Sequence, residues 1–399
     1  MSNSQRLQSI DILRGLTVAG MILVNNGYGD SFDMLRHSKW NGMTPCDLVF
    51  PFFLFIMGVS CFLSLSKSQF TPTAAVLRRV VKRTVLLFAI GLFINWLDHA
   101  IEGDVLCFGH LRIWAVLQRI ALCYLFVSLF ALYANHRYTP HVIVLLLAAY
   151  TLLIIYGNGY AEDASVNILA QADLKLFGYD HLYHKSPVDP EGLLGTISSV
   201  AHVLIGFWCG KLIKGSGTTE RKALAVFAVG TVCIIIGYLL TYGLPLNKRI
   251  WSPSYVLVTC GLAALLLGLL LSIECRVNSV EFLDEPSGEA ERAAAVPLGE
   301  GMAVARSASP LGSSKNSKLY TLNSKLFTVF GVNALALYVC SELLAILFGH
   351  FGISDIIYNA LHSVIVWDKW ASLAYALTFV AINYAIGYAL WRNKIFIKL

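Results

Sequence analysis

Long apolar segments alternate with shorter polar connections along the whole chain. Ten of these segments approach the roughly 20 residues that a helix needs to cross a bilayer. Most of them lack the strict alternation of apolar and polar residues that marks a transmembrane β-strand. The pattern therefore predicts an all-α, polytopic transmembrane helical bundle. The predicted spans cover residues 10–27, 47–66, 80–97, 113–133, 139–157, 193–213, 223–243, 253–273, 325–348 and 371–391.

The segments between and after these spans also carry a pattern. A shorter apolar stretch at 353–366 predicts an interfacial or re-entrant helix. Residues 158–191, an outer connection rich in Asp, Tyr and His, are long enough to cap a cavity. Residues 275–324 are rich in Ser, Gly, Pro and Ala, which predicts a flexible cytoplasmic linker. This linker divides an eight-span block, residues 1–274, from a two-span block, residues 325–399.

Composition and charge narrow the class and the orientation. The 399 residues are 57% hydrophobic and 14% charged, whereas soluble domains carry about 25% charged residues. Soluble, disordered and nucleic-acid-binding classes are therefore excluded. With the N-terminus inside, 21 of the 30 Lys and Arg residues fall in inner segments and eight in outer segments. This bias predicts that both termini are cytoplasmic, and the absence of a small-residue cleavage site predicts that the first span is retained.

The nine cysteines add little chemistry of their own. Most lie within predicted spans, where cysteine acts as a small apolar residue. Cys46 and Cys107 are expected on the outer side, and their positions leave a disulfide between them open. No Cys/His spacing typical of a metal site is present, so no metal is predicted.

The first outer connection holds the densest group of polar side chains. Polar groups within or beside apolar spans need partners or water, so each is a candidate site residue. Imidazole suits proton transfer near neutral pH, Asn amides stabilise oxyanions, and a carboxylate fixes a His tautomer or receives an ammonium. A polar turn with an interfacial Trp explains any single member, but the group as a whole favours a catalytic site. The group comprises Asn25, Asn26, His37, Trp40, Asn41 and Asp47.

A second group is cationic and lies mainly at the inner ends of spans. Cations of inner loops are explained most simply as determinants of orientation, although such groups also serve bound phosphates. Arg119 differs because it lies inside the fourth span, where an unpaired charge is costly. A structural ion pair with Asp47 or Glu342 explains Arg119 as well as a role in anion binding does. The group comprises Arg14, Arg78, Arg79, Lys82, Arg83, Gln118 and Arg119.

A third group is spread over the outer and membrane-lining parts of later segments. Each member alone is explained by a turn, a cap or an interhelical hydrogen bond. Together they predict a polar cavity that crosses much of the bilayer. The group comprises Asp189, Glu191, His202, Asn247, Lys248, Asn333 and Glu342.

Members of all three groups lie in motifs that resemble the heparan-α-glucosaminide N-acetyltransferase family. The first matches are Asp11-Ile12-Leu13-Arg14-Gly15, Asn25, His37, Trp40-Asn41-Gly42-Met43-Thr44 and Asp47-Leu48-Val49-Phe50-Pro51-Phe52-Phe53. Among them the His-x-x-Trp-Asn-Gly and Asp-Leu-Val-Phe-Pro block is specific. The weaker matches are Leu117-Gln118-Arg119-Ile120-Ala121, Asp189-Pro190-Glu191-Gly192, Pro245-Leu246-Asn247-Lys248 with Trp251, Gly331-Val332-Asn333-Ala334-Leu335 and Phe396-Ile397-Lys398. The matches follow one another in order from residue 11 to the C-terminus.

The resemblance implies an enzyme that takes acetyl groups from cytosolic acetyl-CoA, its co-substrate, and delivers them to the amine of a terminal glucosamine across the membrane. It implies that His37 is the catalytic histidine and that Asn25 lies near the acetyl group. The spacing between these two residues is one residue longer here than in the animal enzyme, which makes Asn26 a rival. We expect a protein without the N-terminal lumenal domain of the animal lysosomal members, and the sequence given has no Asn-x-Ser/Thr motif. We therefore expect a bacterial inner-membrane protein that acts on a smaller amino sugar or a cell-envelope saccharide.

Orientation and resemblance together yield a mechanistic hypothesis. His37 acts on the acceptor amine as general base or as nucleophile, and Asn25 or Asn41 donates to the thioester oxyanion. Cofactor binding, through the phosphates of acetyl-CoA that enters from the cytoplasm, is assigned to Arg14, Lys82, Arg83, Gln118 and Arg119. Contact with the acceptor is assigned to Trp40, Asp47, Glu191, Asn247, Lys248 and Asn333.

Two other classes stay open at this stage. An amino-sugar transporter or flippase suits ten spans with a polar interior, but it predicts an inverted repeat that the sequence does not show. A membrane O-acetyltransferase of envelope saccharides uses the same donor and needs stronger base activation, because a hydroxyl is harder to deprotonate than an ammonium. The expected partners are an amino-sugar or glycan acceptor and the lipid bilayer, without nucleic acid, and a homodimer is left open.

Overall fold

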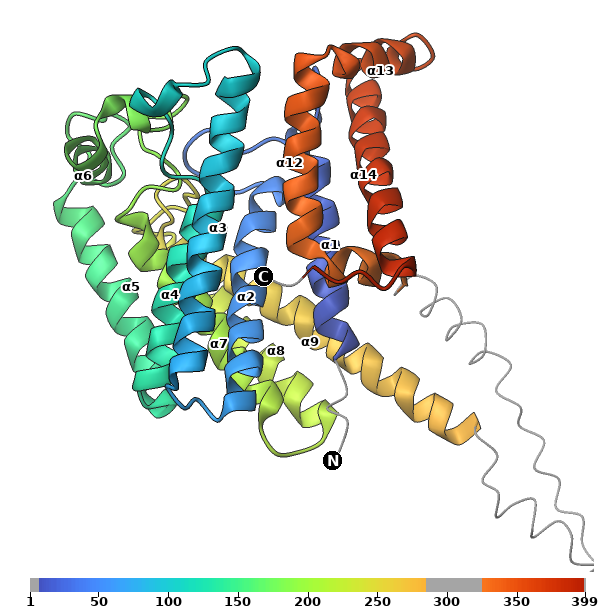
Figure 1. Ribbon diagram of the computed structural model, residues 1–399. Coiled ribbons are helices and arrows are strands. Elements are labelled where there is room, and N and C mark those ends of the chain that lie inside the picture. Colours follow the sequence, from blue (N-terminus) through green and yellow to red (C-terminus); the bar gives the residue numbers. More distant parts are fainter. Residues whose placement is uncertain (1–6, 285–324, 398–399) are drawn as a thin grey trace, which may run out of the picture.

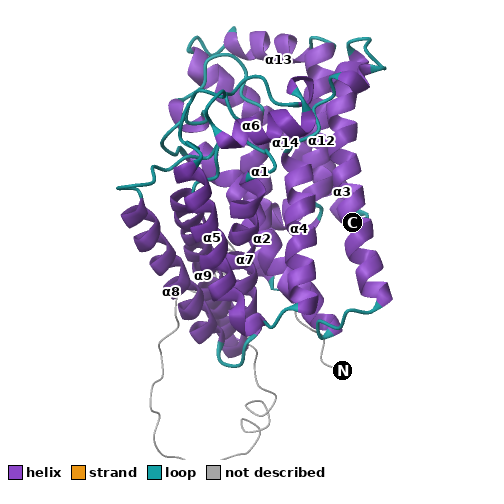
Figure 2. Cartoon of the chain, turned by 90° about the vertical axis from the view of Figure 1, so that its left-hand side faces the viewer, coloured by secondary structure: helices purple, strands orange, loops and turns teal. Residues whose placement is uncertain are grey.

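The computed structural model describes residues 7–284 and 325–397. Within these ranges the chain forms α-helices joined by loops and 3-10 turns, without a β-strand (Figures 1 and 2). The all-α helical bundle predicted from the apolar pattern is confirmed. Eight of the described helices are long and apolar enough to cross a membrane, or nine if one bent pair forms a single span. The number of ten spans stays a prediction.

A helix occupies each of the ten predicted apolar segments. The first eight are α1 (Gln8–Asn25), α2 (Val49–Leu65), α3 (Ala74–Ile101), α4 (Val116–Tyr133), α5 (Thr139–Tyr156), α7 (Gly195–Lys214), α8 (Thr219–Leu240) and α9 (Pro253–Asp284). The later ones are Lys325–Val332 with α12 (Ala334–His350), and α14 (Asp368–Arg392). Two shorter helices, α6 (Ile168–Phe177) and α13 (Ile353–His362), lie at one end of the bundle (Figure 1). We call that end the outer end, and the opposite end, where α1 begins, the inner end.

Two glycines allow the backbones of α2 and α7 to touch where these helices cross. A Cβ atom on Gly58 of α2 would lie 2.1 Å from the carbonyl oxygen of Val203 of α7, and one on Gly206 would lie 2.1 Å from the carbonyl oxygen of Phe55. Helices without a hydrophobic driving force between them associate through such close packing of small residues. The α2–α7 crossing therefore forms the centre of the bundle, with Phe55 and Phe207 fully buried beside it.

The predicted span at 325–348 is not one straight helix. Helix Lys325–Val332 and α12 meet at an angle of 80° on either side of Asn333. The Asn333 amide nitrogen donates to the carbonyl of Ile395 at 3.0 Å, and its amide oxygen accepts from the backbone of Ile397 at 2.9 Å. The break is stabilised because the C-terminal segment satisfies the hydrogen bonds of the Asn333 side chain. The local apolar pattern does not contain this distant contact.

The predicted linker begins later than residue 275. Helix α9 continues through Asp284, so residues 275–284 are helical, and the remainder of the linker lies outside the described residues. Near this extension the Glu274 carboxylate accepts the backbone N–H groups of Gln8 at 3.1 Å and Ser9 at 3.0 Å. A carboxylate at this position satisfies N–H groups that the first turn of a helix leaves without partners. It therefore joins α9 to the start of α1.

Residues 158–194, which include α6, form a cap at the outer end, as predicted for the long outer connection (Figure 2). The cap packs against Trp40, whose indole nitrogen donates to the carbonyl of Tyr160 at 3.1 Å. An apolar cluster continues this contact and contains Trp40, Tyr150, Ile154, Leu169, Ala170, Val188, Leu244 and Ile250. The first outer loop and the loop between α8 and α9 are thus held under one cap.

Candidate active site

A buried carboxylate organises the first outer loop. The turn Pro45–Leu48 begins with a capping box, in which the Asp47 side chain accepts the backbone N–H of Thr44 at 3.1 Å. The same oxygen accepts from the Thr44 hydroxyl and from the backbone of Ser38, each at 3.1 Å. The other oxygen lies 2.7 Å from Nδ1 of His37. Asp47 is fully buried, whereas the His37 side chain is 49% exposed, so the carboxylate orients an imidazole that solvent can reach.

Lys248 enters the same group from the loop between α8 and α9. Its ammonium lies 3.2 Å from the Asp47 carboxylate, and 3.0 Å and 3.5 Å from Nδ1 and Nε2 of His37. Backbone and side-chain contacts lock the two loops together: the Gly42 N–H donates to the carbonyl of Leu246 at 2.7 Å, and Nδ2 of Asn247 donates to Oδ1 of Asn41 at 3.2 Å. The first outer loop and the α8–α9 loop therefore build one His–Asp–Lys cluster.

Two further groups border this cluster. The free thiol of Cys46 is buried with its sulfur 3.1 Å from Nδ1 of His37. Cys107 also carries a free thiol, so the disulfide that the sequence left open is not formed. The Tyr255 hydroxyl of α9 donates to the backbone carbonyl of Asp47 at 2.6 Å. The cluster is thereby attached to a transmembrane helix as well as to loops.

The structure separates the two rival asparagines at the end of α1. Nδ2 of Asn26, which is buried, donates to the carbonyl of Ile22 in its own helix at 2.8 Å. Nδ2 of Asn25, which is exposed, donates to the Glu342 carboxylate of α12 at 3.3 Å. Asn25 therefore keeps an accessible amide, whereas the amide of Asn26 is engaged by its own helix.

Two residues that the sequence analysis assigned to acceptor contact, Trp40 and Glu191, have partners in or beneath the cap. The Trp40 ring is buried in the apolar cluster beneath the cap. One guanidinium nitrogen of Arg112 lies 2.9 Å from the Asp189 carboxylate and 2.8 Å from the Glu191 carboxylate. Glu191 is thus paired within the protein. Arg112 is not among the candidate residues named from the sequence, because its link to the Asp189-Pro190-Glu191-Gly192 motif spans 77 positions.

Arg119 and Asn333 are not among the residues that line the inner basic cavities, although Val332 and Ala334 beside Asn333 do line the middle one. The Arg119 side chain is 1% exposed and donates to the carbonyl of Gly192 at 2.8 Å, with its guanidinium 5.3 Å from the Trp251 ring. It pairs with neither Asp47 nor Glu342 in the contacts described. Neighbouring Gln118 is fully buried. Asn333 holds the C-terminal segment, as described above.

The inner cations gather around three adjoining hollows, here called the inner basic cavities. Their volumes are about 510, 360 and 540 Å³. The first two share Arg14, Ser60 and Ser64, and the last two share Ser64 and Arg83. Three residues that the sequence predicted to bind acetyl-CoA therefore line this group of cavities, namely Arg14, Lys82 and Arg83. Cations that sequence reasoning counted only for orientation also line these cavities, namely Lys67, Arg79, Lys214 and Lys222.

The middle cavity reaches from the inner end toward the outer cluster. It is lined along α2 from Ser64 to Phe53, which corresponds to about 16 Å at the rise of an α-helix. Phe53 lies six positions after Asp47, or about 9 Å further along. The other walls include Gly331, Leu335 and Ile397, so the C-terminal segment contributes to the cavity. Basic groups and the His–Asp–Lys cluster thus lie at opposite ends of the same helix.

Fold and site together define a class: a multi-pass helical membrane protein with a carboxylate-oriented histidine, the arrangement of general acid–base transfer chemistry. Comparison with known proteins identifies the family. Residues 6–244 match the family model described as heparan-alpha-glucosaminide N-acetyltransferase, catalytic. The chain belongs to this acetyltransferase family. Among the described residues, no group of three or more His, Cys, Asp or Glu side chains is arranged to hold a metal ion.

Two curated relatives carry the same name. The chain is 30% identical over 312 residues to heparan-alpha-glucosaminide N-acetyltransferase of Mus musculus, an alignment that covers 64% of this chain and 47% of the mouse protein. It is 28% identical over 328 residues to the Homo sapiens protein, covering 67% of this chain and 49% of the human protein. The chain spans about half the length of the curated relatives it matches.

Proposed function

We propose that this protein is a transmembrane N-acetyltransferase that moves acetyl from cytosolic acetyl-CoA to the amine of a glucosamine-type sugar at the outer side. The observation that carries the proposal is the arrangement along α2. A carboxylate-oriented His37 lies at the outer end of this helix, and the inner basic cavities lie at its other end. This polarity suits a donor with a polyanionic end inside and an acceptor outside. The membrane is a bacterial inner membrane, as expected from the sequence.

The inner basic cavities would hold the phosphates of the donor. Arg14, Lys82 and Arg83 supply cations of the kind that bind phosphate oxygens. Lys67, Lys214 and Lys222 extend the positive surface around the first cavity. The middle cavity extends along α2 toward the outer cluster, and a thioester arm would follow it. Arg119 is not included in this donor site, because it donates to Gly192 beneath the cap.

His37 serves best as the general base. An ionised carboxylate only accepts hydrogen bonds, so its 2.7 Å contact with Asp47 favours a proton on Nδ1 and a lone pair on Nε2. Nε2 takes a proton from the acceptor ammonium, and the neutral amine attacks the thioester carbonyl carbon. The carbon–sulfur bond then breaks, the remaining extra proton passes from the nitrogen to the departing sulfur, and the neutral amide and CoA thiol are released. Lys248, with Asn25 or Asn41, stabilises the oxyanion that forms between these steps.

A covalent acetyl-imidazole on His37 is the second route to the same products. Kinetics separate the two routes, because a covalent intermediate gives ping-pong behaviour and a trappable acetyl group on His37. Direct transfer requires both substrates to be bound together. The site therefore serves either mechanism with the same residues.

The test uses purified protein in liposomes, with acetyl-CoA and glucosamine supplied on opposite sides of the membrane. We expect thiol release that depends on glucosamine and N-acetylglucosamine that accumulates on the acceptor side. Sugar movement without thiol release would identify a transporter or flippase instead. Faster acetylation of an amine-free sugar than of glucosamine would identify an O-acetyltransferase of envelope saccharides.

A further inference from the structure

Helix α13 joins the outer ends of two long helices and lies across them. It follows α12 and precedes α14, and its axis runs across the top of both in Figure 1. The sequence pattern at 353–366 left an interfacial and a re-entrant helix open. A re-entrant segment turns back between the spans, whereas α13 stays at the level where its two neighbours end. The structure therefore favours the interfacial alternative.

One face of α13 packs against the bundle. Ile357, Tyr358 and Leu361 belong to the apolar cluster shared with α1, α12 and α14. On the same face, the buried Ser354 hydroxyl accepts from the Tyr375 hydroxyl at 2.9 Å. Residues three, four and seven positions apart share one side of a helix, so this face is the ordinary core-facing side.

A second stripe along α13 is polar. Asp355, Asn359 and His362 follow one another at steps of four and three positions. Asp355 accepts from the Tyr28 hydroxyl of the first outer loop, and Nε2 of His362 lies 2.7 Å from the Asp368 carboxylate at the start of α14. This stripe therefore faces the outer loops and water.

A third stripe is apolar although it does not face the bundle. Ile356 is 69% exposed, and Ala360, one turn further on, is exposed as well. In the turn that follows, Val364 is 81% and Trp367 72% exposed. The same segment exposes Phe351, Val366 and Trp370. A helix with a second apolar face needs a second apolar environment, because contact between apolar surface and water is unfavourable.

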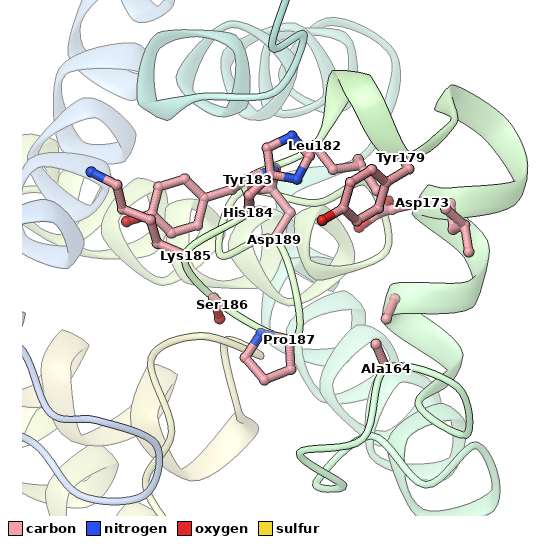
Figure 3. A pocket seen from close by; sticks show the side chains of 12 residues that line it. Ala164, Asp173, Tyr179, Leu182, Tyr183, His184, Lys185, Ser186, Pro187 and Asp189 are labelled. Atoms are coloured by element: carbon pink, nitrogen blue, oxygen red, sulfur yellow. The ribbon is translucent and has the colours of Figure 1, made fainter. Parts of the chain in front are cut away.

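The hollow of the cap shows what a water-filled part of the outer end looks like. The cap lies across the outer end from α13 in Figure 1. Its hollow, of about 460 Å³, has polar groups on seven of its 12 lining side chains, and Figure 3 shows Tyr183, His184 and Lys185 among them. The third stripe of α13 has no such groups, so it is not suited to water.

The position of α13 in the chain identifies lipid as its apolar environment. Helix α14 is long and apolar enough to span a membrane, and α12 with Lys325–Val332 forms the bent pair that passes the same test. In a multi-pass membrane protein the bilayer surface crosses such helices near their ends, which is where α13 lies. Trp367 and Trp370 occur at this level, and tryptophan is enriched at membrane–water interfaces.

Two contacts connect this region to the loop that carries His37. The hydroxyl oxygens of Ser31 and Ser372 lie 2.8 Å apart. The Phe32 ring meets the Trp370 ring edge-on, with 5.1 Å between the centroids. His37 follows Phe32 by five positions. The outer ends of α13 and α14 therefore hold the beginning of the first outer loop.

We infer that α13 lies in the lipid–water interface at the outer end. Ile356, Ala360, Val364 and Trp367, here called the lipid stripe, insert at the boundary between headgroups and acyl chains, as in other amphipathic helices that lie on a membrane. The polar stripe faces water and the first outer loop. The inference is independent of acetyl transfer and rests on the membrane class of the protein.

The first experiment measures the depth of Trp367. The purified full chain is reconstituted into phosphatidylcholine liposomes in which the lipid carries bromine either close to the headgroup or near the end of the acyl chain. Bromine quenches the fluorescence of a tryptophan that it contacts, and the difference between the wild type and Trp367→Phe reports Trp367. We expect bromine close to the headgroup to quench this tryptophan at least about twofold more strongly.

The control for the depth measurement is Trp114→Phe, which removes a buried indole and should leave quenching by lipid unchanged. If aqueous acrylamide but no brominated lipid quenched Trp367, the stripe would face water. If neither quenched it, a second copy of the chain or another protein would cover it. Either result would overturn the inference.

The second experiment compares the same charge on two stripes. Ile356→Asp places a carboxylate on the lipid stripe, and Asn359→Asp places one on the polar stripe three positions further on; both positions are exposed. In lipid nanodiscs we expect Ile356→Asp to lower the Tm by about 3 °C and Asn359→Asp to change it by less than about 1 °C. Equal shifts would contradict insertion of the lipid stripe. If Ile356→Asp fails to fold, the conservative Trp367→Phe variant still decides the question.

Discussion

The outer cluster and the inner basic cavities differ in how their charges are held. At the outer end one carboxylate is fully buried, and all its close contacts are to groups fixed by two interlocked loops. At the inner end cations from several helices surround open cavities, and among the described residues Asp11 is the one acidic side chain that lines them. The first arrangement fixes the direction of one imidazole. The second supplies positive potential without one fixed geometry, so we expect the two regions to respond differently to mutation.

The largest expected effect is the replacement of the imidazole at the outer cluster. His37→Ala should lower kcat for acetyl transfer about 10³-fold, because it removes the proposed general base. Binding of acetyl-CoA at the inner cavities should be unchanged, as measured by titration of the purified protein. His184→Ala, which alters an exposed histidine of the cap, is a control for transfer to glucosamine alone. If His37→Ala kept the kcat of the wild type, His37 would not be the general base.

The next effect concerns the charge beside the imidazole. Lys248→Met should lower kcat about 10²-fold, because it removes the ammonium that we propose stabilises the developing oxyanion, with little change in KM for acetyl-CoA. Lys248→Arg keeps the charge and should recover part of the activity. Steady-state thiol release measures both. A larger effect on KM than on kcat would assign Lys248 to substrate binding instead.

A smaller effect is expected at the inner end. Arg83→Gln should raise KM for acetyl-CoA about tenfold with little change in kcat, since it removes one of several phosphate contacts. Arg78→Gln is the matched control, because Arg78 lies on the same helix but does not line the inner basic cavities. An equal change in both variants would show that general positive charge, not the cavity, matters.

The last effect concerns stability, not turnover, and is a dependence on pH in the cap. Burial raises the pKa of Asp173 from 3.8 to about 6, so ionisation opposes folding. This cost is complete above about pH 6 and disappears as the pH falls toward 4. Asp173→Asn should therefore be more stable than the wild type at pH 7.5, by at most about 3 kcal/mol, and the difference should shrink on acidification. Thermal unfolding in detergent measures this difference in stability, and Asp180→Asn, at an exposed position, is the control. A stability difference that grows at low pH would contradict the prediction.

The apolar pattern predicted the helices well because the helical period and the length of a span are local properties. Helix α2, for example, coincides with the predicted segment 47–66 to within a few residues. The pattern missed the 80° break at Asn333, because its cause is a pair of hydrogen bonds to a segment more than 60 positions away. It also placed the start of the linker too early at α9, because a polar helix that extends beyond the bundle resembles a linker in composition.

For the candidate site, too, the sequence indicated individual residues but not the contacts between them. Polar residues near apolar spans marked His37, Asp47 and Lys248 individually, and the family resemblance joined them to one function. Their pairwise contacts follow from the packing of two loops separated by more than 200 positions. Arg119 and Glu191 were marked by the same rule, yet each is engaged within the protein near the cap. A polar residue in an apolar segment must find a partner, but its sequence position does not say whether that partner is a ligand.

The sequence by itself determined that this is a membrane-embedded helical bundle of the acetyltransferase family, and it supplied the polar residues from which a site can be built. The tertiary structure alone decided which of them meet. Local periodicity reports whether a segment is helical and apolar, because those properties depend on residues within a few turns. Contacts such as Lys248 with His37, or Arg112 with Asp189, depend on how distant segments pack, and only the folded chain brings their charges within 3.2 Å.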